Sequence, residues 1–258
     1  MSIALVSTIA VLAIVILLVG NSPGWPRVQR GFFDFERFAE AWPSVVRGFL
    51  LNIQIFLIAE VLILVWALVL AILRNLKGPV FFPFRLFAIV YIDLFRGLPS
   101  ILIVYVMGFA IPALGIPGVT KDVFFWAVVT LVLVWSAYVA EVYRAGLDSV
   151  HPSQEAAARS LGLSSAQAFR YVVLPQAIRR IVPPLLNDAI GLQKDTALVA
   201  FLGPVEAFRR AQVLAGGWFN YTPYLVSAVL FLLLTVPLAR LVDWLTARDR
   251  KRYLAGAR

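Results

Sequence analysis

Long apolar runs separated by short polar stretches set the pattern of the chain. A run of about twenty apolar residues is long enough to cross a membrane as an α-helix. Such runs predict an all-α membrane protein with six spans and no separate soluble domain. The predicted spans cover residues 3–20, 45–73, 86–110, 123–143, 183–203 and 222–245.

The amino-acid composition agrees with this pattern. Hydrophobic residues make up 61% of the 258 residues and charged residues only 14%, whereas a soluble domain is roughly half apolar and a quarter charged. The absence of cysteine excludes disulfides and thiolate metal sites, and His151 is the single histidine, so we expect no metal site. Basic cytoplasmic loops explain the net charge of +9, so no nucleic-acid partner is expected.

The first apolar run is either a cleaved signal peptide or a retained span. Residues 1–6 carry no charge, and residues 21–23 do not match a small-residue cleavage site. We therefore interpret residues 1–40 as an N-terminal transmembrane helix followed by an extracytoplasmic linker. Residues 41–247 then form the main transmembrane domain, and residues 248–258 form a basic cytoplasmic tail.

The placement of Lys and Arg predicts which side of the membrane each loop faces. The turn at 74–85, the polar stretch at 141–180 and the tail contain three, five and five basic residues, respectively. The loops at 21–44, 111–122 and 204–221 contain three, one and two. Because basic loops stay on the cytoplasmic side, we expect the first set and both chain ends to be cytoplasmic.

The long polar stretch after the fourth span carries the signals of two short helices. Pro152 suits the first turn of a helix, where its missing N–H is not needed, and Gly162 suits the left-handed position after a helix end. Ser164 and Gln167 have the spacing of a capping box, which predicts a second helix that ends before Pro175. We expect a compact helix–turn–helix rather than a plain connecting loop.

Motifs in this stretch and elsewhere resemble the permease subunits of ABC importers. Residues 141–162, with Gln154-Glu155-Ala156-Ala157 and Leu161-Gly162, are similar to the cytoplasmic EAA loop of these permeases. Three further motifs are similar to the branch of the family that transports histidine, glutamine, glutamate or arginine. They are Phe95-Arg96-Gly97-Leu98-Pro99, Leu174-Pro175-Gln176-Ala177 and Lys194-Asp195-Thr196-Ala197-Leu198.

The resemblance covers most of residues 42–247. It implies the MetI-like fold of ABC importer transmembrane domains, with five core helices plus one extra N-terminal helix. It also implies a permease in the bacterial inner or plasma membrane that imports a polar amino acid, with glutamate or glutamine favoured and a basic amino acid as the second choice. Residues 141–180 would form the coupling loop. The ATPase-coupling residues would be Glu155, Ala156, Ala157, Leu161 and Gly162.

The chain itself lacks the G-x-x-x-x-G-K-[ST] signature of a phosphate-binding loop. ATP would therefore have to be bound and hydrolysed by another polypeptide. The resemblance implies that this partner is a cytoplasmic ABC ATPase dimer, and that the chain is not an enzyme and binds no cofactor. It further implies a second permease chain, identical or paralogous, and an extracytoplasmic amino-acid-binding protein. Membrane lipid would cover the remaining surface of the spans.

Polar residues inside the predicted fifth span are candidates for the transport pathway, because ionisable groups are unfavourable there without a function. Lys194 and Asp195 lie about eleven residues, or roughly 16 Å, into that span. Asn187 and Asp188 precede them by seven residues, so the four side chains form one polar stripe. Asp195 offers an anion for the ammonium of an amino acid, and Lys194 offers a cation for its carboxylate. Thr196 adds a neutral hydroxyl.

Several of these residues also have a structural interpretation. Lys194 and Asp195 can pair with groups on neighbouring helices instead of binding substrate. Glu60, in the second span, either faces the pathway or forms a buried interhelical hydrogen bond. Arg209 and Arg210, in an outer loop, either contact a binding protein or are solvated.

Two charged pairs have the i,i+3 spacing of an ion pair within one helix. They are Asp93 with Arg96 and Glu141 with Arg144. We predict that each pair is satisfied internally and has no part in transport.

Other functional classes explain the pattern less well. An ion-coupled secondary amino acid transporter is the main alternative, but such proteins usually contain internal repeats or matching broken helices, and the sequence has no convincing repeat. A membrane enzyme would need a polar constellation near an interface, for which the lone His151 gives little basis. A scaffold protein would not require Lys194 and Asp195 near the membrane midplane.

Overall fold

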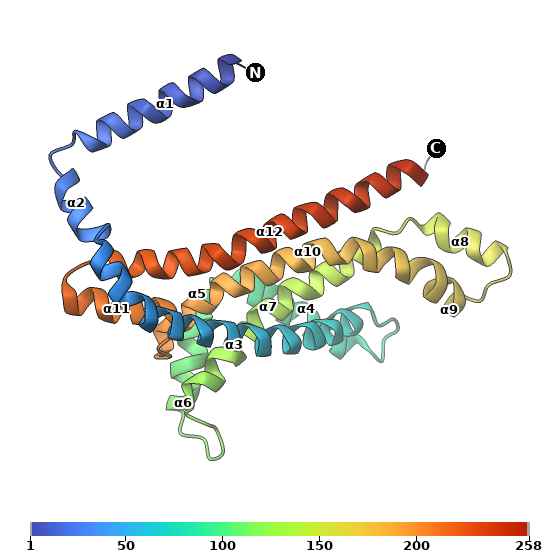
Figure 1. Cartoon of the computed structure of the whole chain (residues 1–258). Helices are drawn as coiled ribbons and strands as arrows, with labels where there is room; N and C mark the ends of the chain where they lie inside the picture. The colour runs from blue at the N-terminus through green and yellow to red at the C-terminus, as the bar shows by residue number, and fades with distance from the viewer. Residues whose placement is uncertain (1, 257–258) are drawn as a thin grey trace.

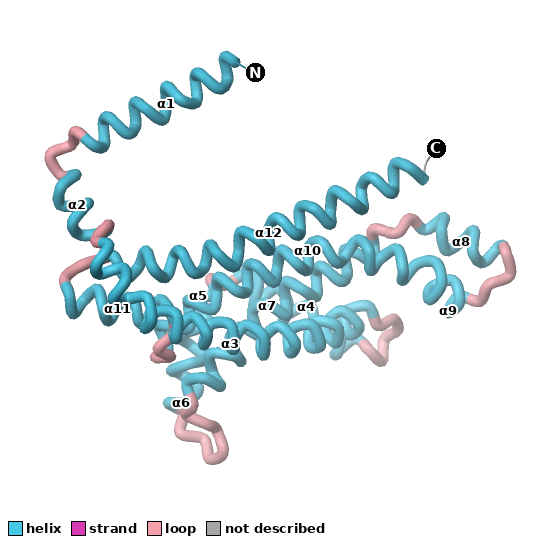
Figure 2. Tube along the Cα trace, in the orientation of Figure 1, coloured by secondary structure: helices cyan, strands magenta, loops and turns pink. Residues whose placement is uncertain are grey.

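The computed structural model describes the backbone of residues 2–256 and the side chains of residues 5–248. Every regular element in that part of the chain is helical, and α3, α10 and α12 run side by side in one bundle (Figure 1 and Figure 2). The predicted all-α class is confirmed. The basic tail is described only as the end of a helix, and Arg258 lies outside the described residues.

The helices differ widely in length. Three short helices of other types connect some of the α-helices. They are the π-helical stretches η1 (Val106–Ala110) and η2 (Phe169–Val173) and the 3-10 helix η3 (Thr196–Leu202). The α-helices are α1 (Ser2–Gly20), α2 (Trp25–Phe32), α3 (Phe35–Asn75), α4 (Phe82–Gly97), α5 (Ser100–Tyr105), α6 (Ile111–Ala113), α7 (Val123–Asp148), α8 (Pro152–Ser160), α9 (Ser165–Ala168), α10 (Leu174–Asp195), α11 (Ala207–Trp218) and α12 (Thr222–Gly256).

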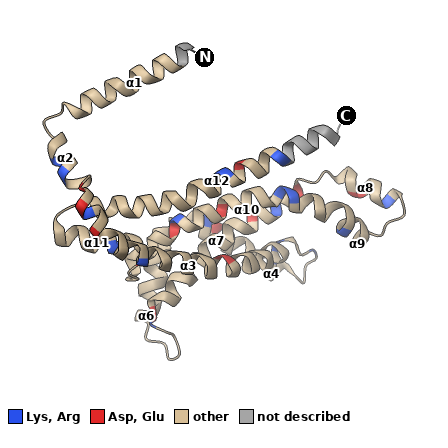
Figure 3. Ribbon diagram, viewed as in Figure 1, with Lys and Arg blue, Asp and Glu red and all other residues tan. Residues whose placement is uncertain are grey.

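Three helical segments are long and apolar enough to cross a membrane, namely Trp25–Asn75, Val123–Asp148 and Thr222–Arg248. α1 is apolar along its length, contains no charged residue and stands apart from the bundle, with its large side chains exposed (Figure 3). α10 is more polar than the three spans. The predicted second, fourth and sixth spans therefore lie in these three segments, and the first lies in α1.

The centre of the bundle is the contact between α3 and α7. The buried residues of α3 recur every three or four positions, which places them on one helix face. Many are small, so the helix backbones approach closely. The face of α3 includes Val45, Ile55, Ala59, Ile63, Ala67 and Leu70, and α7 contributes Leu131, Val134 and Ala137.

The third predicted span, residues 86–110, is wrong as a single helix. The segments Phe82–Gly97 and Ser100–Ala113 together are apolar enough to cross a membrane, but they are bent by 108°. Leu98, at the bend, has φ −97 and ψ 141. The residue before a proline is disfavoured in the helical region, so Pro99 forces the break at this position.

The helix–turn–helix in the predicted coupling loop is present as α8 and α9. Pro152 lies in the first turn of α8, and Gly162 has the positive φ, +91, that its position requires. Ser164 and Gln167 form both hydrogen bonds of the predicted capping box. α8 and α9 project at one end of the bundle, whereas α11 and the start of α12 lie at the opposite end (Figure 1).

The predicted end of the second short helix at Pro175 is wrong. α9, η2 and α10 follow one another without a loop, and Pro175 lies in the first turn of α10. A proline disrupts an α-helix because it lacks an N–H and crowds the preceding turn. The π-helical turn η2 just before it has a different hydrogen-bond pattern, which accommodates the proline. α10 also continues through Pro183 and Pro184, so the fifth span does not begin there.

Candidate functional site

The predicted pathway residues lie where α10 changes into the 3-10 helix η3. α10 ends at Asp195, and η3 begins at Thr196. Lys194 and Asn187 are exposed, whereas Asp188 and Asp195 are half-buried. In the part of the chain that the structure describes, Lys194 forms no ion pair, so its charge is available on the open face of α10.

Thr196 is held within the protein instead of facing a cavity. Its side chain is fully buried, and its hydroxyl donates to the Gln193 carbonyl oxygen at 2.6 Å. The same hydroxyl accepts from Asn52 Nδ2 at 3.0 Å, which links η3 to α3. Thr196 has no surface for a ligand in this conformation, and its geometry is that of a structural link.

Asn52 and Glu206 complete this buried polar cluster, and neither was a predicted site residue. Asn52 Nδ2 also donates to Glu206 Oε2 at 3.0 Å, and the backbone N–H of Ala207 donates to Asn52 Oδ1 at 3.0 Å. Both side chains are fully buried. Glu206 is the N-cap residue of α11, but glutamate is not among the residues that favour this position, so the sequence contains no clear signal for it.

Glu206 accepts hydrogen bonds from the first turn of α11. The backbone N–H groups of Phe208 and Arg209 donate to its carboxylate at 2.9 and 2.7 Å. Burial raises the pKa of the Glu206 carboxyl, while these N–H groups and the Asn52 amide act in the opposite direction. The carboxylate therefore serves to fix the start of α11.

A glycine allows the start of α11 to lie directly on α3. A Cβ on Gly48 would lie 2.6 Å from the Glu206 carbonyl carbon, which is closer than real Cβ contacts allow. The Asn52 side chain, one helical turn further along α3, then reaches Thr196, Glu206 and Ala207 together.

Glu60 of α3 and Asp188 of α10 lie on two helices that contact each other, which their separate positions in the sequence did not predict. Both side chains are half-buried. Asp188 Oδ2 is buried and has no hydrogen-bond partner in the described structure. Neither residue forms an ion pair with a described cation. A pair of this kind can accept an ammonium group.

A second charged cluster joins α3, α4 and α7. Glu141 pairs with Arg74 at the end of α3, with Arg144 at 2.8 Å and with Arg96 at 3.8 Å. The predicted Glu141–Arg144 pair is confirmed. The predicted Asp93–Arg96 pair is wrong: Arg96 is drawn to Glu141 on the neighbouring helix, and Asp93 is exposed without an ion pair in the described structure.

The residues predicted to couple to an ATPase are mostly exposed. Ala156, Ala157 and Gly162 are exposed, and Leu161 is 85% exposed. Glu155 differs, because it is half-buried and accepts from Ser165 Oγ at 3.3 Å, which ties α8 to α9. A leucine so exposed at the tip of a projecting loop is well placed for a contact with another protein.

Comparison with known protein families identifies the family to which the chain belongs. The family model described as the binding-protein-dependent transport system inner membrane component matches residues 79–251, about two thirds of the 258 residues. The chain belongs to this family. The resemblance indicated by its motifs is confirmed, and the inner membrane component is a multi-pass membrane protein with several apolar helices.

Relatives of this inner membrane component match it over most of their length. A probable amino-acid permease of Bacillus subtilis (strain 168), YxeN, is 32% identical over 85% of this chain and 97% of its own length. A probable glutamine ABC transporter permease of the same organism, GlnP, is 33% identical over 78% of this chain and 89% of its own. The arginine transport system permease ArtQ, also from Bacillus subtilis, is 31% identical over 79% and 91%.

Solved structures of ABC transporters share the fold of the inner membrane component. A crystal structure of an amino acid ABC transporter with histidines has a TM-score of 0.77 and 30% identity, over 83% of this chain and 98% of that chain. The MetNI methionine ABC transporter, in an inward-facing conformation, has a TM-score of 0.62 and 20% identity, and it supports the fold alone. The predicted MetI-like fold is confirmed, and the roles of individual residues stay predictions.

Proposed function

We propose that the chain is the transmembrane permease subunit of an ABC importer for a polar amino acid, driven by ATP hydrolysis in a separate subunit. Membership of the family of inner membrane components carries this proposal. Relatives named for glutamine and arginine transport support an amino acid as the substrate. The chain itself binds no cofactor in this proposal.

The proposed complex contains a cytoplasmic ABC ATPase dimer that binds ATP and docks on α8 and α9. The exposed Leu161, Ala156 and Ala157 support this contact. A second permease chain, an extracytoplasmic amino-acid-binding protein and membrane lipid complete the surroundings. The basic loops support an orientation in the inner membrane with α8, α9 and both termini on the cytoplasmic side.

The proposed transport pathway runs along the open face of α10. Lys194 and Asn187 would contact the carboxylate and polar side chain of the substrate, and Asp195 would assist with the ammonium. Glutamate or glutamine is the first candidate substrate. The Glu60–Asp188 pair favours a basic amino acid as the second candidate, because the α-ammonium needs only one of two carboxylates and the other can pair with a cationic side chain.

Uptake of radiolabelled amino acids by cells that express the complete transporter would test this proposal. The substrate is identified by supplying four amino acids one at a time, namely glutamine, glutamate, arginine and histidine. We expect uptake that depends on ATP, with an altered apparent KM in Asp195→Ala. If the substrate is basic, Asp188→Asn should weaken arginine uptake more than glutamine uptake. Uptake that follows an ion gradient and ignores ATP would instead support a secondary transporter.

A further inference from the structure

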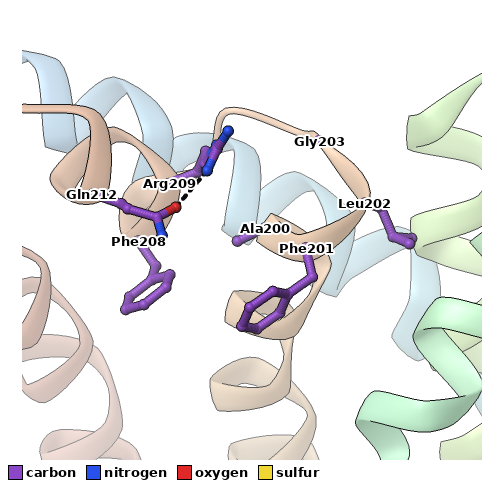
Figure 4. A pocket seen from close by; sticks show the side chains of 7 residues that line it. All are labelled: Ala200, Phe201, Leu202, Gly203, Phe208, Arg209 and Gln212. Carbon is purple, nitrogen blue, oxygen red and sulfur yellow. Dashed lines mark hydrogen bonds between the residues drawn. The ribbon is translucent and has the colours of Figure 1, made fainter. Parts of the chain in front are cut away.

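A small pocket lies where η3 turns into α11, beyond the residues predicted for the transport pathway (Figure 4). Arg209 and Gln212 of α11 meet at one side of it, and Phe201 of η3 and Phe208 of α11 supply aromatic rings. Its volume is about 180 Å³. Sites for drug-sized ligands begin at roughly 300 Å³, so this pocket suits only a small group.

The guanidinium of Arg209 is not neutralised by a carboxylate in the described part of the chain. Its Nη1 donates to Gln212 Oε1 at 2.5 Å, and a guanidinium has four further N–H donors. Glu206, the carboxylate closest in sequence, is buried and accepts instead from backbone N–H groups and from Asn52. Arg209 therefore offers an unpaired positive charge and free donors beside the pocket.

The neighbouring Arg210 has a different environment. It is half-buried, and its Nη1 donates to Ser44 Oγ of α3 at 3.4 Å. Arg210 does not line the pocket. Arg209 and Arg210 therefore have different surroundings, although they carry the same charge and both lie in the first turn of α11.

The frame of the pocket is fixed by the buried cluster described above. Asn52 holds Glu206 and the N–H of Ala207, and Gly203, with φ +121, forms the turn between η3 and α11. Such a conformation is readily adopted only by glycine. A ligand that enters the pocket would find its polar groups already positioned, which reduces the entropy lost on binding.

We infer that Arg209 and Gln212 bind the α-carboxylate of the amino acid as it enters, before it reaches Lys194 and Asp195. Arginine binds a carboxylate with two parallel hydrogen bonds, and the rings of Phe201 and Phe208 can cover the aliphatic part of the substrate. η3 leads directly from this pocket to Asp195. The inference rests on the proposed function, and it assigns the first contact of the substrate with the permease.

Competition between an amino acid and its α-amide would test the role of the carboxylate. The purified permease–ATPase complex, without binding protein, would be titrated with radiolabelled glutamine or arginine and competed with glutamine α-amide or arginine α-amide. The wild type should prefer the free acid. Since a hydrogen bond to a charged group contributes about 1.5–3 kcal/mol, Arg209→Gln should weaken binding of the acid by roughly tenfold to a hundredfold and reduce the preference by the same factor, leaving only the part that Lys194 supplies.

Two further variants make this test specific. Arg209→Lys keeps the charge and should restore part of the preference for the free acid, whereas Arg210→Gln removes an equal charge and should leave it at the wild-type level. A wild type that binds acid and amide equally, or an Arg209→Gln variant that keeps the full wild-type preference, would overturn the inference. In both cases normal ATP-driven uptake by the wild type would leave the proposed function intact. Loss of uptake with every amino acid would instead overturn the proposed function and this inference with it.

Discussion

The α8–α9 pair and the junction of α10, η3 and α11 are polar segments of the same chain that are stabilised in different ways. In α8–α9, hydrogen bonds join close neighbours, such as Ser164 and Gln167, and most side chains are exposed. At the junction, Asn52 bonds to Thr196 and Glu206 across 144 and 154 positions of the chain, and all three are buried. Local bonds leave a surface free for a partner, whereas long-range bonds fix the backbone beside the proposed pathway.

Among the variants that test this comparison, Asn52→Leu should lower the free energy of unfolding the most. It leaves the buried Ala207 N–H without its acceptor and takes one hydrogen bond each from the Glu206 carboxylate and the Thr196 hydroxyl, which keep other partners. An unsatisfied buried group costs about 1–3 kcal/mol and a lost hydrogen bond about 1 kcal/mol, so the free energy of unfolding should fall by about 3 kcal/mol. Thermal unfolding of the purified permease measures this. Asn187→Leu, at an exposed position of α10, should change the Tm little. Equal shifts in both variants would contradict the role of the cluster.

Gly48→Ala should have the next largest effect, because it places a methyl group against the backbone at Glu206. Overpacking of this kind costs about 1–3 kcal/mol. Gly216→Ala in α11 is the matched control, since nothing lies within 4 Å of its added Cβ, and a helical Gly→Ala change there should be neutral or stabilising. Thermal unfolding compares the two. A stabilised Gly48→Ala variant would show that α11 does not lie on α3 as described.

Ser164→Ala should have a smaller and local effect. It removes the cap of α9 and costs about 1 kcal/mol, which corresponds to about fivefold faster amide exchange in Ser165–Ala168 if the loss is confined there. Hydrogen exchange followed by mass spectrometry measures it, and the Tm of the whole protein should hardly change. Exchange that also rises in α10 would show that α9 and α10 unfold together.

Leu161→Arg should have the smallest effect on stability. Leu161 is 85% exposed, and surface substitutions usually change the free energy of unfolding by less than about 0.5 kcal/mol. Thermal unfolding checks this expectation. A large loss of stability would mean that Leu161 packs against the permease itself and is not free to contact a partner.

Sequence reasoning succeeded where the structure depends on neighbouring residues. The capping box of Ser164 and Gln167 and the turn at Gly162 follow from local rules and are present. Pro99 was included in a span because apolar character alone does not reveal a bend. The junction was missed because Glu206 has its side-chain partner on α3, and sequence spacing gives no distance between separate helices.

The charged residues show the same limit. Glu60 and Asp188 were each identified as candidates, but the contact between their helices, α3 and α10, is seen only in the structure. Arg96 was assigned to the nearest carboxylate in its own helix, yet Glu141 on α7 is its partner. The polar residues inside the spans could be listed from the sequence, but which of them meet across helices could not, and the roles of the listed residues stay predictions.

Coupled uptake and ATP hydrolysis in proteoliposomes test the central claim most directly. Three complexes would be compared at equal protein content: the wild type, Leu161→Arg, and Lys77→Glu, which changes a charge on the predicted cytoplasmic side outside α8 and α9. We predict ATP-dependent uptake in the wild type and in Lys77→Glu, and loss of uptake in Leu161→Arg with amino acid binding retained. Wild-type levels of uptake in Leu161→Arg, or uptake without ATP, would contradict the account.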